Sequence, residues 1–154
     1  AFGLSQTLSI SVGEAKEMIN AYFSTFPDVR KYLDQTVEQA TLCGYATTMF
    51  GRRRYIPELN ASNKRFAAFG QRTAMNHPMQ GSAADIIKIA MIDVVKEMRN
   101  KNMKSKCVLQ VHDELDFSVV KDELDDLSNL VKDRMQNAVK LDVPLIVDIA
   151  IGPN

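Results

Sequence analysis

Three consecutive residues near the middle of the second half have side chains that could take part in chemistry: His112, Asp113 and Glu114. They lie between the apolar runs CVLQV and LDFSVV, which predicts a hairpin with these three residues at its turn. The turn has no glycine, and its two adjacent carboxylates repel each other unless a positive group lies nearby. Carboxylate oxygens suit magnesium, which completes its shell with water and substrate phosphates. From the turn alone, a magnesium site and a solvated acidic turn both remain open.

A second set of polar residues recurs at intervals of four: Arg72, Asn76 and Gln80. Residues four apart on a helix lie on the same face. Guanidinium and amide groups can donate to the minor-groove acceptors, which every base pair presents in similar positions. Such contacts would test the geometry of a duplex without reading its sequence. Ordinary polarity of a helix surface is the alternative.

Helical and strand periodicity predicts the elements that position these residues. The first half is expected to hold a helix over about 12–25 with Ser11 and Glu14 as a capping box, a helix over 28–43 ended by Gly44, and a hairpin near 45–56 with Arg52, Arg53 and Arg54 at its turn. A helix over 62–77 capped by Ser62 and a helix over 78–99 follow. The last elements are strands over 107–111 and 115–120, a helix over 121–139 and a strand over 145–151. Pro78 is expected to break or sharply bend the helical pattern, because proline lacks an amide donor and its ring clashes with the preceding turn. Strands with helices between them predict an α+β fold.

Composition narrows the class of protein. The chain has 154 residues, 45% of them apolar and 25% charged, which is typical of one globular domain. No apolar run approaches the roughly 20 residues that span a bilayer, and the first ten residues lack the pattern of a secretory signal, so no membrane partner and a cytoplasmic location are expected. Cys43 and Cys107 are isolated and are interpreted as reduced apolar residues.

The net charge of zero conceals two segments of opposite sign. Residues 44–112 hold 12 Lys and Arg against 4 Asp and Glu, net +8, whereas residues 113–142 hold 9 acidic against 4 basic residues, net −5. A basic segment is compatible with a phosphate-bearing partner, and solvated helix faces are the alternative.

Two segments taken together resemble a known family. QRTAMNHPMQGSAADIIKIAM, over 71–91, is followed by QVHDEL, over 110–115, and both are closely similar to the family A DNA polymerases, the family of the bacterial DNA polymerase I type. The resemblance covers nearly the whole chain, since AFGLSQTLSI and FGRRRYIPEL match the family in the same order. Ser82 stands where the family usually has threonine, a change that keeps the hydroxyl.

The resemblance implies a role for each candidate residue. Asp113 would bind catalytic Mg2+, with Glu114 beside it as a second catalytic carboxylate. His112 would lie near the primer terminus, and the DNA-binding residues Arg72, Asn76 and Gln80 would contact template and primer on the minor-groove side. The implied partners are primer-template DNA, deoxynucleoside triphosphates and the rest of the parent polymerase chain.

The resemblance also implies a division of the chain. Residues 1–154 would be the C-terminal part of a polymerase domain: 1–100 a mostly helical fingers and palm segment with the short hairpin near 45–56, and 101–154 a palm sheet and helix. The fold is then expected to be α+β, with an antiparallel palm-type sheet that carries the His112–Glu114 hairpin and packs with several helices.

The family's second metal-binding aspartate and its nucleotide-holding helix lie before residue 1, and relatives continue beyond IGPN, so the chain is interpreted as a fragment that is inactive alone. The parent is expected to be a DNA-directed DNA polymerase, a nucleotidyltransferase of DNA replication and DNA repair. A non-catalytic DNA-binding module is the alternative. Single-subunit RNA polymerases share the palm plan but typically have serine at the position of Glu114.

Overall fold

The computed structural model describes residues 1–152, so Pro153 and Asn154, the last positions of the expected palm segment, lie outside the described residues. Contacts between Cα atoms divide the chain into two units. The first contains Ala1–Ala46 and Arg53–His77, and the second contains Thr47–Arg52 and the residues from Pro78 onwards.

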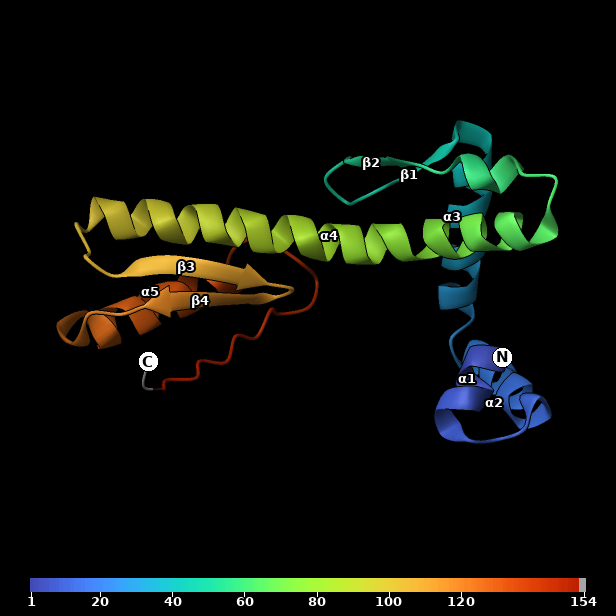
Figure 1. Ribbon diagram of the computed structural model, residues 1–154, viewed down its shortest axis with the longest axis horizontal. Helices are drawn as coiled ribbons and strands as arrows, with labels where there is room; N and C mark the ends of the chain where they lie inside the picture. Colours follow the sequence, from blue (N-terminus) through green and yellow to red (C-terminus); the bar gives the residue numbers. More distant parts are fainter. Residues whose placement is uncertain (153–154) are drawn as a thin grey trace. The chain divides into compact units, whose positions relative to one another are not determined.

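The first unit is mainly helical (Figure 1). Its elements are α1 (Phe2–Leu8), α2 (Val12–Thr25), α3 (Pro27–Cys43), the hairpin strands β1 (Tyr45–Thr47, of which Thr47 belongs to the second unit) and β2 (Arg53–Tyr55), the 3-10 helix η1 (Pro57–Asn60) and the first part of α4 (Lys64–Asn100). The two predicted helices and the predicted hairpin are confirmed, whereas α1 was not expected. Of the three arginines expected at the hairpin turn, Arg53 and Arg54 lie in β2 instead.

Local capping explains where α2 and α3 begin and end. The Ser11 hydroxyl accepts from the Glu14 amide at 3.1 Å, and the Glu14 carboxylate accepts from the Ser11 amide at 2.8 Å, so the predicted capping box is formed. Gly44 ends α3 with φ 79°, in the left-handed region that glycine enters without a steric penalty.

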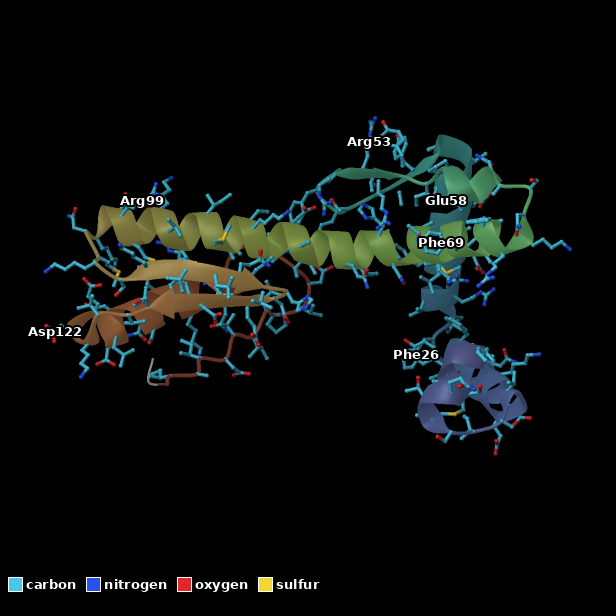
Figure 2. The ribbon with its side chains drawn as sticks, in the orientation of Figure 1. Phe26, Arg53, Glu58, Phe69, Arg99 and Asp122 are labelled. Carbon is cyan, nitrogen blue, oxygen red and sulfur yellow. The ribbon has the colours of Figure 1, made fainter. Side chains whose placement is uncertain are left out.

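A small apolar core holds the hairpin and η1 in the first unit. Its buried members are Ala40, Ala46, Ile56 and Ala74, with Val37 and Leu59 packed against them. Ile56 is the bulkiest of the four and is 1% exposed. Figure 2 labels Glu58 and Phe69 where η1 lies close to α4.

The helix α4 runs from Lys64 to Asn100 and contains Pro78, so the predicted break at this proline is wrong. A proline inside a helix costs about 3 kcal/mol or more. Residues of α4 on both sides of Pro78 pack into apolar cores, since Ala74 is fully buried in the first unit and Val94 is fully buried in the second. The start of α4 is also corrected: the Asn63 side chain, not that of Ser62, accepts from the Arg65 amide, at 2.9 Å.

The second unit packs two helices and a hairpin around one apolar core (Figure 1). Its remaining elements are β3 (Lys106–Val111), β4 (Glu114–Ser118), the 3-10 helix η2 (Lys121–Glu123) and α5 (Leu124–Gln136). The buried core residues are Val94 and Met98 from α4 and Leu127, Leu130 and Val131 from α5, with Met103, Phe117 and Met135 against them. The predicted hairpin and the predicted helix after it are confirmed, although α5 ends three residues before the expected 139.

The predicted strand over 145–151 is wrong, because these residues form neither helix nor strand. Figure 1 draws this segment, in red, without an arrow. An extended chain is assigned to a strand when its backbone groups pair with a neighbouring strand. The apolar residues of this segment include Ile146 and Ile151, both well exposed. The sheets within the described residues are two antiparallel pairs, β1 with β2 and β3 with β4. The mixed α+β class is therefore supported.

Candidate active site and nucleic-acid interface

The hairpin β3–β4 has a turn of two residues, His112 and Asp113. Val111 pairs with Glu114 across the hairpin, so Glu114 is the first residue of β4 and not part of the turn. His112 has φ 50°, a left-handed conformation that is uncommon for residues other than glycine. The Gln110 side-chain amide donates to the His112 carbonyl at 2.8 Å, which stabilises the turn.

Asp113 and Glu114 occupy different backbone settings although they are neighbours. Both side chains are exposed. Successive side chains of a strand point to opposite faces, so Glu114 is on the face opposite to Leu115 and Phe117. Phe117 packs against the core of the second unit. Asp113 is in the turn, where its carboxylate is carried at the end of the hairpin.

The carboxylates at this turn are donors of the kind that magnesium takes. Magnesium binds through one or two carboxylates and takes its remaining ligands from water and phosphates. Asp113 offers one such carboxylate and Glu114 a second. Within residues 1–152, no group of three or more His, Cys, Asp and Glu side chains is arranged to hold a metal ion, so a complete protein cage is not formed by these residues.

A bulge interrupts β3 between Cys107 and Leu109, where the register shifts by one residue. Cys107 is a free thiol, and its burial, reinforced by the negative charge of Asp116, raises its pKa. A raised pKa keeps the thiol protonated and unreactive at neutral pH. Cys43 is also a free thiol and is exposed.

The three candidate DNA contacts are all carried by α4 and are all exposed. Arg72 and Asn76 belong to the first unit, and Gln80 belongs to the second together with the β3–β4 hairpin. Their predicted roles remain predictions.

Sequence reasoning missed a set of contacts beside Gln80. The nitrogen Nε of Arg52 lies 2.7 Å from Oδ1 of Asp85, although the two residues are 33 positions apart. The arginine run over 52–54 was noticed as positive charge, but local periodicity carries no information about pairing at this separation.

No helix in the described part of the chain is long and apolar enough to cross a membrane.

The fold and the hairpin can now be compared with known proteins. The model of "DNA polymerase family A" matches residues 1–154, and this chain belongs to that family. Among its curated relatives, DNA polymerase I of Bacillus subtilis is 49% identical over 153 residues, and DNA polymerase I of Geobacillus stearothermophilus is 47% identical over 152 residues. Each alignment covers 99% of this chain but 17% of the relative, so the chain spans about a sixth of their length.

A solved structure is also similar to this chain. It is the POL domain of Pol1 from M. smegmatis in complex with DNA primer-template and dNTP. The TM-score is 0.89 and the sequences are 49% identical, over 94% of this chain and 25% of the other. The family resemblance inferred from the two sequence segments is therefore confirmed.

Proposed function

We propose that this chain is part of a template-directed DNA polymerase that adds deoxynucleotides to a primer 3′ end. The match to DNA polymerase family A along the whole chain is the observation that carries this proposal. The similar M. smegmatis domain was solved with primer-template and dNTP, which supports the same partners here. In the reaction, the primer 3′ hydroxyl attacks the α-phosphate of the nucleotide, and pyrophosphate leaves.

In this proposal Asp113 holds Mg2+ through its carboxylate, and Glu114 lies beside the site as a second acidic group. When bound, the metal would neutralise phosphate charge and stabilise the attacking and leaving oxygens. The two-residue turn favours this assignment, because it limits the positions that the short Asp113 side chain can take. Catalysis of this kind depends mainly on positioning and on charge neutralisation.

The minor-groove side of the duplex is assigned to Arg72, Asn76 and Gln80, with His112 near the primer terminus. All four side chains are exposed, and the first three occur at intervals of four on α4. Their donors suit acceptors that all base pairs share, so they would hold the duplex without selecting a sequence.

We also infer that these 154 residues do not catalyse extension by themselves, because they span about a sixth of the length of the DNA polymerases I that they match. The test is primer extension with a labelled primer, Mg2+ and saturating dNTPs, in parallel for the complete polymerase and for the 154-residue chain. Extension by the complete protein alone is the expected result. Magnesium-dependent extension by the isolated chain, free of contaminating polymerase, would contradict the inference that these 154 residues are inactive by themselves. DNA binding without extension by the complete protein would indicate a non-catalytic DNA-binding module.

A further inference from the structure

Residues Thr47–Arg52 form the tip of the β1–β2 hairpin, and this tip is hydrogen-bonded to the part of α4 that follows Pro78. The Met49 amide donates to the Ser82 hydroxyl at 2.9 Å, and that hydroxyl in turn donates to the Pro78 carbonyl. Nη2 of Arg52 donates to the Gly81 carbonyl at 3.0 Å. Ser82 is 9% exposed, so these contacts are largely shielded from water.

An ion pair continues the same set of contacts one turn further along α4. Arg52 bridges Gly81 and Asp85, donating to Asp85 from Nε at 2.7 Å. The Asp85 side chain is 13% exposed, and burial alone would raise its pKa, but hydrogen bonds from Thr48 and Arg52 and the charges of Arg52 and Lys88 outweigh that effect and lower it. Asp85 is therefore ionised at neutral pH. A planar guanidinium can serve two acceptors at once, which a lysine ammonium does less well.

The hairpin tip is itself internally ordered. The Thr48 hydroxyl accepts from the Phe50 amide at 3.3 Å and from the Arg52 amide at 3.2 Å. Gly51 has φ 79°, which allows its amide to close the turn onto the Thr48 carbonyl at 2.9 Å. Thr48 is 4% exposed. A tip held by its own hydrogen bonds can act as a fixed support for the helix beside it.

Gln80 stands between Pro78 and Gly81 in the sequence, and its side chain is exposed. Proline cannot donate a backbone hydrogen bond, so the turn of α4 that leads into Pro78 has one bond fewer than an ordinary turn. The hairpin tip adds hydrogen bonds from outside the helix to the next turn, at Gly81 and Ser82. We propose that Arg52 and Ser82 are positioning residues for Gln80: they fix the helical turn that presents its amide to the minor groove. The inference rests on the proposed function, in which Gln80 contacts the duplex.

The test uses the complete polymerase and two primer termini, a natural purine and a 3-deazapurine, which lacks the minor-groove N3 acceptor. Loss of the Gln80 amide in Gln80→Ala should lower kcat/KM on the natural terminus by about tenfold, the size expected for one hydrogen bond in the transition state. The 3-deaza terminus should lower kcat/KM of the wild type by a similar factor and should hardly change kcat/KM of Gln80→Ala. We call this factor the 3-deaza penalty.

Ser82→Ala should reproduce this pattern in weaker form, since it leaves the Gln80 amide present but poorly placed. We expect kcat/KM on the natural terminus to fall about threefold to tenfold, and the 3-deaza penalty to shrink. Ser82→Thr keeps the hydroxyl and should restore both quantities. The double variant Ser82→Ala/Gln80→Ala should be no slower than Gln80→Ala alone, because residues that act through one another are not additive.

Arg52→Lys provides a second route if Ser82→Ala folds poorly. The Arg52 side chain is 47% exposed, and lysine keeps the positive charge beside Asp85 while losing the bridge to Gly81. It should also reduce the 3-deaza penalty. The positioning role would be overturned if the losses multiply in the double variant and the 3-deaza penalty is unchanged in Ser82→Ala and Arg52→Lys. The proposed Gln80 contact would then still stand. A Gln80→Ala enzyme that behaves as wild type on both termini would overturn the positioning role and the minor-groove contact together.

Discussion

The backbone of Leu59 lies so close to Gly70 that a β-carbon built on Gly70 would be 2.8 Å from the Leu59 nitrogen. The same β-carbon would be 2.9 Å from the carbonyl carbon of Glu58. These neighbours are backbone atoms, which cannot rotate away as a side chain can. Gly70 therefore allows η1 to approach α4, and this approach buries Ile56 and Ala74 in the core of the first unit.

Gly70→Ala should for this reason destabilise the protein although alanine favours helices. Forcing an extra methyl group into packed structure costs about 1–3 kcal/mol, more than the roughly 0.5–1 kcal/mol that alanine gains over glycine in a helix. The measurement is the urea dependence of unfolding. Gly13→Ala is the matched control, because Gly13 is also helical and the nearest atom to its added β-carbon, the Ser11 hydroxyl oxygen, would be 3.7 Å away. Equal effects of the two substitutions would contradict the close-approach explanation.

Much of the local structure could be predicted because its signals are local. Ser11 and Glu14 are three residues apart, and Gly44 follows its helix directly, so sequence spacing alone identifies both ends. The β3–β4 hairpin was found in the same way. The length of its turn could not be predicted, because whether Glu114 belongs to the turn or to β4 depends on its pairing with Val111.

The failures share a different cause, which is packing between residues distant in sequence. Pro78 predicts a break only if nothing else supports the helix, and the contacts that Met49 and Arg52 make with Ser82 and Gly81 of α4 cannot be read from neighbouring residues. The segment over 145–151 has the composition of a strand but no strand partner among the described residues. For the candidate site, sequence motifs identified Asp113 and Gln80, whereas Arg52 and Asp85 required the three-dimensional structure.

A first functional prediction concerns the minor-groove contacts. Arg72→Ala and Gln80→Ala in the complete polymerase should each weaken primer-terminus binding or extension by about tenfold, and by a similar factor for all four terminal base pairs. The reason is that minor-groove acceptors occupy nearly the same positions in every base pair. Primers that differ in the terminal pair, extended under single-turnover conditions, provide the measurement. A loss confined to one terminal base would indicate direct sequence recognition instead.

A pH prediction follows from Glu123 at the base of the β3–β4 hairpin. Its carboxylate accepts from the Lys104 amide at 2.8 Å and from the amide and the hydroxyl of Ser105 at 2.8 and 2.6 Å, and these hydrogen bonds lower its pKa from the ordinary 4.5. A lowered pKa stabilises the folded state above the ordinary pKa, and this contribution is lost as the pH falls through the folded-state pKa.

Glu123→Gln should therefore reduce stability most near neutral pH, and the difference from the wild type should shrink as the pH falls below 4.5. Urea unfolding midpoints at pH 6 and pH 3.5 give the comparison. Asp122→Asn is the control, since Asp122 is an exposed neighbour that makes none of the hydrogen bonds described for Glu123. A constant difference between Glu123→Gln and the wild type at both pH values would show that the carboxylate charge does not stabilise this region.

Asp113 and Glu114 carry the same charge but should differ in function. Asp113 lies in the two-residue turn, whereas Glu114 begins β4 opposite Val111, so their carboxylates leave the backbone in different directions. Magnesium requires near-ideal octahedral geometry, so we expect the two carboxylates to bind one ion unequally. The shorter Asp113 side chain is also held more closely to the backbone, which favours it as the direct ligand.

Asp113→Ala in the complete polymerase should lower kcat by several orders of magnitude while primer-template binding stays nearly unchanged, because the lost interaction stabilises the transition state rather than the bound duplex. Glu114→Ala should be clearly milder. Single-turnover incorporation and equilibrium DNA binding, each at several magnesium concentrations, separate the two effects. Equal, mild losses in both variants would remove the metal role from this hairpin, and a larger loss in Glu114→Ala would assign the ligand to Glu114.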